Sequence, residues 1–152
     1  MISILKVGQN QYLENFEPVT LEPTAFDEQG NPTEFQERWV IPRDPLELAR
    51  LMADTLVWLA KQRVQKVLEE YGYYSLGDLQ VYASQNDQEA QAILSWYQAY
   101  DRAIWDYISQ NFDPIVNGTQ QVTVDQILKN YSDLRAIEEE IFNQSIQTSQ
   151  LP

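Results

Sequence analysis

The sequence predicts a mainly α protein, in which a domain of three to five helices follows an extended or β-hairpin N-terminal arm. The composition changes near residue 44: residues 1–43 hold four of the seven prolines and show no helical period. Residues 44–147 carry almost all of the helical patterning. Apolar residues make up 43% of the 152-residue chain, which is enough for a core. We therefore expect an arm over 1–43, a helical domain over 44–147 and a frayed tail over 148–152.

Short strands are expected in the arm. Residues 2–7 alternate loosely between apolar and polar side chains, which indicates a strand. Residues 19–22 and 38–41 flank a dense turn cluster at residues 27–32, which indicates a hairpin or a reversed extended arm. A two-stranded ribbon alone is marginal in water. We therefore expect the arm to pack on its own helices or on another chain.

The first helix has a clear start. Asp44 is a good N-cap, Pro45 suits the first helical position, and Glu47 can complete a reciprocal cap. An apolar face then repeats at alternating steps of three and four residues, and Gly72 provides a stop. The residues of this face are Leu46, Ala49, Ala53, Leu56, Ala60, Val64, Val67 and Tyr71.

Two more helices are expected in the middle of the chain. Ser75 and Asp78 form a cap pair for a short helix that ends near Ala83, and Asn86 and Glu89 open the next helix in the same manner. The second of these helices has a strongly apolar face. Its residues are Ile93, Trp96, Tyr97, Tyr100, Ile104, Tyr107 and Ile108.

The C-terminal part should contain a loop and two further helical segments. Residues 111–118 include a proline and an Asn-Gly pair and indicate a loop. Thr123 and Gln126 have the spacing of a capping box for a short helix. A last amphipathic helix follows over residues 134–142, and residues 145–152 are expected to fray.

Charge and composition exclude several classes of function. The chain has 23 acidic and 10 basic residues, so its net charge of −13 opposes binding to phosphate backbones and to anionic membranes. Histidine and cysteine are both absent, which removes Ser-His-Asp and Cys-His catalysis and thiolate metal sites. We therefore expect no enzymatic activity, no cofactor and no metal, and partners that are neither nucleic acid nor membrane.

The acidic runs are interpreted as solvated helix faces. The densest are Glu69–Glu70 and residues 138–140, and runs of like charge on a helix usually face water. An acidic hydrolase that works through paired carboxylates stays open as an alternative, because it needs no histidine. A mimic of nucleic acid, which would occupy basic grooves of other proteins, stays open as well.

Aromatic side chains crowd one predicted helix. Most of them follow the stripe of Trp96, Tyr100 and Ile104, and such a stripe is more typical of a core than of a surface that stacks bases or sugars. Trp105 lies off this stripe, so we interpret it as an anchor that faces a partner. Trp39, in the arm, is the second candidate interface residue.

An ordered series of short motifs runs through roughly residues 45–130. Its members are Gly72, Tyr73, Ser75, Tyr82, Ala83, Glu89, Ala90, Ala92, Trp96, Ala99, Gly118 and Thr123. The series resembles a family of small phage proteins encoded beside tail fibres, with the pattern R-G-Y-x-S, Y-A, E-A-x-A-x-x-x-W-x-x-A-x-W and G-x-x-x-P-T-x-E-E-L-I. Tyr71 replaces the arginine of that pattern and Val122 the proline, and the second tryptophan follows the first by nine residues.

The resemblance implies a non-catalytic protein of the phage tail. It would be a structural or adaptor component that binds a tail-fibre or baseplate protein, with homo-oligomerisation left open. An assembly chaperone that leaves before the virion is complete is the alternative. The expected location is the virion tail, or the host cytoplasm during assembly.

Overall fold

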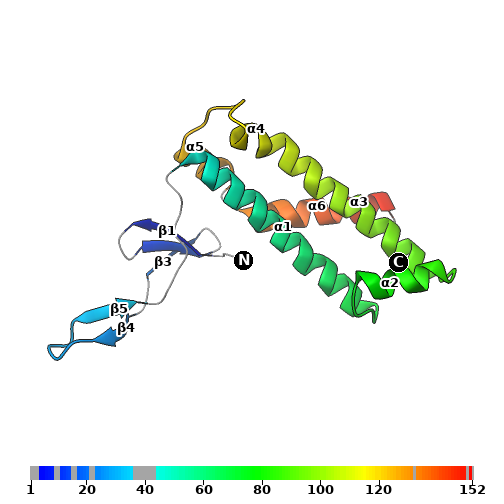
Figure 1. The fold of residues 1–152 in the computed structure, drawn as a ribbon, viewed down its shortest axis with the longest axis horizontal. Coiled ribbons are helices and arrows are strands. Elements are labelled where there is room, and N and C mark those ends of the chain that lie inside the picture. The colour runs from blue at the N-terminus through cyan, green and yellow to red at the C-terminus, as the bar shows by residue number, and fades with distance from the viewer. Residues whose placement is uncertain are drawn as a thin grey trace.

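A computed structural model describes residues 4–8, 11–14, 17–20, 23–35, 44–131, 133–149 and 151. Five short strands come first along the described chain, and six helices follow them. Figure 1 shows the strands in blue and the helices from cyan to red. The predicted mainly α fold with a β-hairpin arm is confirmed.

The first three strands form an antiparallel meander. They are β1 (Ile4–Gly8), β2 (Gln11–Glu14) and β3 (Glu17–Thr20), hydrogen-bonded in that order. Leu5 lies opposite Leu13 across the first pair. The strand expected over residues 2–7 corresponds to β1, which covers residues 4–8, and residues 2 and 3 lie outside the described residues.

A separate hairpin follows the meander, made of β4 (Pro23–Phe26) and β5 (Pro32–Phe35). The Asp27 side chain organises its turn, because its Oδ1 accepts hydrogen bonds from the backbone N–H of Gln29 at 2.9 Å and of Asn31 at 2.8 Å. Gly30 has a φ of 81°, a left-handed conformation that glycine adopts without strain. The turn cluster was therefore identified correctly.

The strands of this hairpin differ from those expected. They lie directly beside the turn, whereas the sequence predicted pairing between residues 19–22 and 38–41. Residues 19 and 20 belong to β3 in the other sheet, because residues 23–26 take the position next to the turn. Residues 38–41 lie outside the described residues.

Helix α1 (Pro45–Glu70) begins at the predicted N-cap. The Asp44 side chain accepts a hydrogen bond from the backbone N–H of Leu46 at 3.0 Å, with Pro45 in the first turn. Most of the apolar face is buried, but Ala53 and Tyr71 are partly exposed. Leu46 is 43% exposed, because it belongs to the capped first turn, ahead of the first buried residues. Gly72, with a φ of 83°, follows the C-terminus of the helix.

The next two helices are α2 (Leu76–Ser84) and α3 (Gln88–Asn111). Ser75 caps α2 by accepting from the backbone N–H of Asp78 at 3.1 Å, as predicted. Asp87, rather than the expected Asn86, caps α3. Asn86 instead takes a φ of 64° between the two helices, where it reverses the chain.

Three helices complete the chain: α4 (Asp113–Val116), α5 (Val124–Asn130) and α6 (Leu134–Ser149). The turn α4 lies inside the loop expected over 111–118 and raises the number of helices to six. The capping box at the start of α5 is present. The expectation of a frayed end was wrong for residues 145–149, because α6 continues through them and buries Ser145.

The core of the described part lies between the long helices. Figure 1 shows α1 and α3 side by side and running in opposite directions, and α6 packs against both. The stripe of Trp96, Tyr100 and Ile104 is buried, which confirms its interpretation as core. Stacked and edge-on aromatic pairs supply much of the packing there.

The backbone at Asn86 gives a test of local strain. Asn86→Ala should lower the free energy of unfolding by about 1 kcal/mol, because a Cβ without a polar side chain is unfavourable at positive φ. Asn86→Gly should change it by less than about 0.5 kcal/mol. Urea unfolding followed by circular dichroism measures both, and equal losses would mean that a side-chain contact, not the backbone, matters.

Candidate functional site

Only one of the two predicted interface residues can be placed. Trp105 lies on α3 and is 50% exposed, which agrees with its position off the buried stripe. Trp39 lies outside the described residues. The surface of α3 around Trp105 is therefore the candidate binding surface.

A groove between α1 and α3 reaches Trp105. Its volume is about 330 Å³, and it remains open to solvent. Ser75 and Leu76, at the start of α2, form part of its lining, and Lys61 and Asp101 are the charged residues among those that line it. Most of its lining is apolar, including Val57, Val64, Leu68, Tyr97, Tyr100 and Ile104.

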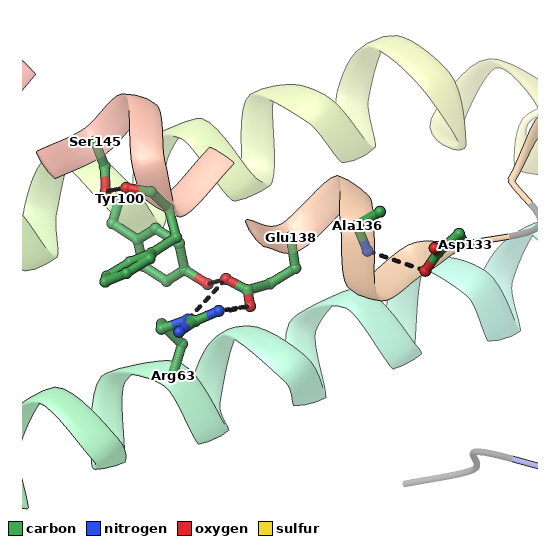
Figure 2. Close-up of polar contacts among 7 residues, drawn as sticks. Arg63, Tyr100, Asp133, Ala136, Glu138 and Ser145 are labelled. Carbon is green, nitrogen blue, oxygen red and sulfur yellow. Dashed lines mark hydrogen bonds and ion pairs between the residues drawn. The ribbon is translucent and has the colours of Figure 1, made fainter. Parts of the chain in front are cut away.

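A buried polar network lies behind the groove. Glu138 of α6 is 5% exposed and accepts hydrogen bonds from Nη2 of Arg63 at 2.8 Å and from its Nε at 3.1 Å. The Tyr100 hydroxyl donates to the same carboxylate at 2.8 Å. Figure 2 shows Glu138 between Arg63 on α1 and Tyr100 on α3. Tyr100 therefore lies between the network and the groove, because it is fully buried and is also one of the residues around the groove.

Aromatic rings surround this network. The Arg63 guanidinium lies 4.1 Å from the centroid of the Phe142 ring, within the range of a cation–π contact. Trp96 stacks on Tyr100 with centroids 5.3 Å apart, and its Nε1 donates to Ser145 Oγ at 2.9 Å. Within the described part, every buried side-chain nitrogen and oxygen has a hydrogen-bond partner.

The environment shifts the pKa of two members of the network. Burial lowers the pKa of Arg63, but the hydrogen bonds and the charge of Glu138 outweigh this effect and raise it above the usual value. Burial also raises the pKa of Tyr100, and the charge of Glu138 adds to the rise. Both groups therefore keep their protons at neutral pH and donate to Glu138.

The interpretation of residues 138–140 as a solvated run was wrong for one member. Glu139 and Glu140 are exposed, but Glu138 is buried. Its position in the helical period explains the difference: α6 buries Leu134, Glu138, Ile141 and Ser145, which are spaced by four, three and four residues. The spacing of the apolar residues alone would have identified Glu138 as an inward-facing position.

A second hollow, of about 200 Å³, bears on the paired-carboxylate hypothesis. It is lined by Glu138 and Glu139 together with Arg63, Lys66 and Arg135, among others. Glu138 already accepts hydrogen bonds from Arg63 and Tyr100, so its oxygens are committed to holding α6 in place. This arrangement resembles a structural ion pair more than a carboxylic acid that faces a sugar.

The described residues hold neither a metal-binding cluster nor a membrane-spanning helix. They contain no group of three or more Asp, Glu, His or Cys side chains arranged to hold a metal ion. None of their helices is both long enough and apolar enough to cross a membrane.

Comparison with protein-family models, with curated proteins and with solved structures found no match to this chain.

Glu138→Gln tests the network. It should lower the free energy of unfolding by roughly 3 kcal/mol, because it leaves the Arg63 charge without its ion-pair partner. We expect the lower end of the usual range, since 19% of the Arg63 side chain is still exposed. The neighbouring exposed change Glu139→Gln is the matched control and should alter stability by less than about 0.5 kcal/mol. Urea unfolding compares them, and equal effects would remove the network from the account of stability.

Stability should fall in alkaline solution. Burial raises the pKa of Tyr73 and of Tyr107 to about 12, with the charges of Asp87 and Glu89 adding to the effect at Tyr73. A tyrosine of the unfolded chain has a pKa of about 10. The unfolded state therefore loses these protons first, and the stability present below about pH 10 declines between about pH 10 and 12.

Urea unfolding over a series of pH values measures this decline. Tyr107→Phe removes one of the titrating groups and should make the decline shallower. A stability that stays constant from about pH 10 to 12 would contradict the proposed role of the buried tyrosines.

Proposed function

We propose that the chain is a non-catalytic structural or adaptor component of a phage tail, associated with the fibre or baseplate, and that it works by binding other protein chains. The observation that carries the proposal is the apolar groove between α1 and α3 with Trp105 half-exposed in its lining. An exposed apolar hollow beside a tryptophan is typical of a surface that buries side chains of a partner.

The charges of the groove favour binding over catalysis. Lys61 and Asp101 come from different helices, and the remaining lining is mainly apolar. Acid–base catalysis needs titratable groups directed at a reacting atom, whereas a protein contact needs apolar area with a few polar groups at its edge. The groove has the second composition.

The assignment to a phage tail rests on the sequence resemblance. Several of its motif residues have structural positions in the fold: Gly72 terminates α1, and Tyr73, Ala83, Ala90 and Trp96 are buried. The motif series therefore describes how this helical domain is built. The role in the tail is inferred from the resemblance itself.

An assembly chaperone for the tail fibre is the second candidate. A net charge of −13 keeps a chain soluble at the concentrations that a transient factor needs. The two candidates differ in one respect, since a structural component stays in the finished particle and a chaperone leaves it.

Mass spectrometry of purified particles of the encoding phage tests the proposal. We expect the chain in the particle at a constant copy number relative to the fibre protein. Its absence from particles, combined with capture of free fibre protein from the lysate, would support the chaperone instead. Absence from both would contradict the assignment to a phage tail.

Alanine substitution tests the anchors. Trp39→Ala or Trp105→Ala should weaken capture of the fibre or baseplate protein in a pull-down, because a buried tryptophan contributes strongly to an interface. Trp105→Ala should lower the free energy of unfolding by about 1 kcal/mol or less, since half of the side chain is already in water. Tyr82→Ala, at 45% exposure on α2, is the matched control. Unchanged capture would discard the substituted residue as an anchor.

A further inference from the structure

We propose that the groove between α1 and α3 is a homotypic interface, in which a second copy of this chain binds about a two-fold axis parallel to the groove. The inference rests on the proposed function only in treating the groove as a protein-binding surface. It names the occupant of that surface, and it assigns to Trp105 a contact with the groove of the second copy.

The first argument is that α1 and α3 supply most of the groove, and that among the described residues the start of α2, at Ser75 and Leu76, completes its lining. The helix α6 packs on α1 and α3 through Glu138, which contacts Arg63 and Tyr100. On α1, Arg63 lies two residues from Lys61 and Gln65, so its side chain points to a different side of the helix from those groove residues. A second α1–α3 pair placed on the groove would complete a four-helix arrangement, a common way to bury two such faces.

The second argument is that a half-exposed tryptophan lies at the edge of an apolar hollow. Trp105 is half-exposed, and the groove beside it has a volume of about 330 Å³. In a two-fold interface the same patch is used by both copies, so each contact occurs twice. A patch that contains both a half-exposed tryptophan and an apolar hollow can therefore bind to the same patch on a second copy. In that contact each Trp105 is covered by the groove of the other copy.

The third argument is charge complementarity between the two walls. Lys61 stands on the α1 wall and Asp101 on the α3 wall, and neither forms an ion pair within the described part of the chain. A two-fold axis parallel to the groove brings the α1 wall of one copy opposite the α3 wall of the other. Lys61 then faces Asp101 of the second copy, and the symmetry repeats this pair.

The arrangement also answers the objection from net charge. Two copies of a chain with a charge of −13 repel each other. Screening shortens this repulsion to a Debye length of about 8 Å at physiological ionic strength. Within that distance the groove of each copy has one positive group, Lys61, and one negative group, Asp101. Contact through this face therefore brings together two pairs of opposite charges.

Charge reversal on the purified full chain tests the inference, with sedimentation velocity at physiological ionic strength as the readout. The wild-type chain should be a dimer. Lys61→Asp and Asp101→Lys should each raise the dimer Kd by roughly tenfold or more, because each change converts both symmetry-related pairs into like-charge pairs. The double variant restores both pairs with reversed sign and should dimerise as the wild type does.

Mixing the two single variants gives the sharpest result. At a protein concentration between the Kd of the wild type and that of the variants, each variant alone should be mainly monomeric. The Lys61→Asp chain carries only acidic groups on the two groove walls and the Asp101→Lys chain only basic ones, so a mixture of the two should form a heterodimer. Arg102→Asp and Asp106→Lys are the matched controls, because both residues are exposed on α3 and do not line the groove. Circular dichroism of every variant checks that the helices are retained.

Three results would overturn the inference: a wild-type chain that stays monomeric, single variants that dimerise like the wild type, or a mixture that remains monomeric. Its failure is distinguishable from failure of the proposed function. If the chain is monomeric but present in phage particles, the tail assignment stands and the dimer is ruled out. If the chain dimerises but is absent from particles and captures no fibre protein, the dimer stands and the tail assignment is ruled out.

Discussion

A carboxylate inside a helical core must be neutralised and hydrogen-bonded, because an uncompensated buried charge costs several kcal/mol. Glu138 meets this requirement because Arg63 of α1 and Tyr100 of α3 both donate hydrogen bonds to it. The relative positions of the three long helices are therefore mutually dependent. A shift of any one of them along its axis would break at least one of these contacts and leave the carboxylate or the guanidinium without its partner in an apolar surrounding.

Tyr100 places this constraint directly beneath the groove. It is fully buried, its hydroxyl donates to Glu138 at 2.8 Å, its ring stacks on Trp96, and it is one of the residues around the groove between α1 and α3. A buried residue held at both its ring and its hydroxyl gives the groove side chains that pack on it a fixed support, so they have less freedom to lose when a partner binds. Pre-organisation of this kind lowers the entropic cost of association. The buried network thus contributes to the groove by keeping its shape constant.

Features that depend on neighbouring residues could be predicted from the sequence, and features that depend on distant ones could not. The caps at Asp44, Ser75 and Thr123 are local hydrogen bonds, and the phase of Trp105 follows from the period of its own helix. The groove needs residues from two helices, α1 and α3, that are separated along the chain by α2, so no local pattern contains it. Glu138 is an intermediate case, because its inward position follows the period of α6 but its partners lie on other helices.

The charges in the groove are balanced, whereas the chain as a whole is strongly acidic. An excess of negative charge opposes random contact between copies and favours approach only where opposite charges meet. In the groove, Lys61 and Asp101 balance each other within a mainly apolar lining, so this face does not add to the general repulsion. The rest of the surface then acts as a barrier to wrong orientations. In the dimer that we propose, the apolar area around Trp105 would supply the affinity. The two charges would set the orientation, since electrostatic complementarity contributes more to specificity than to affinity.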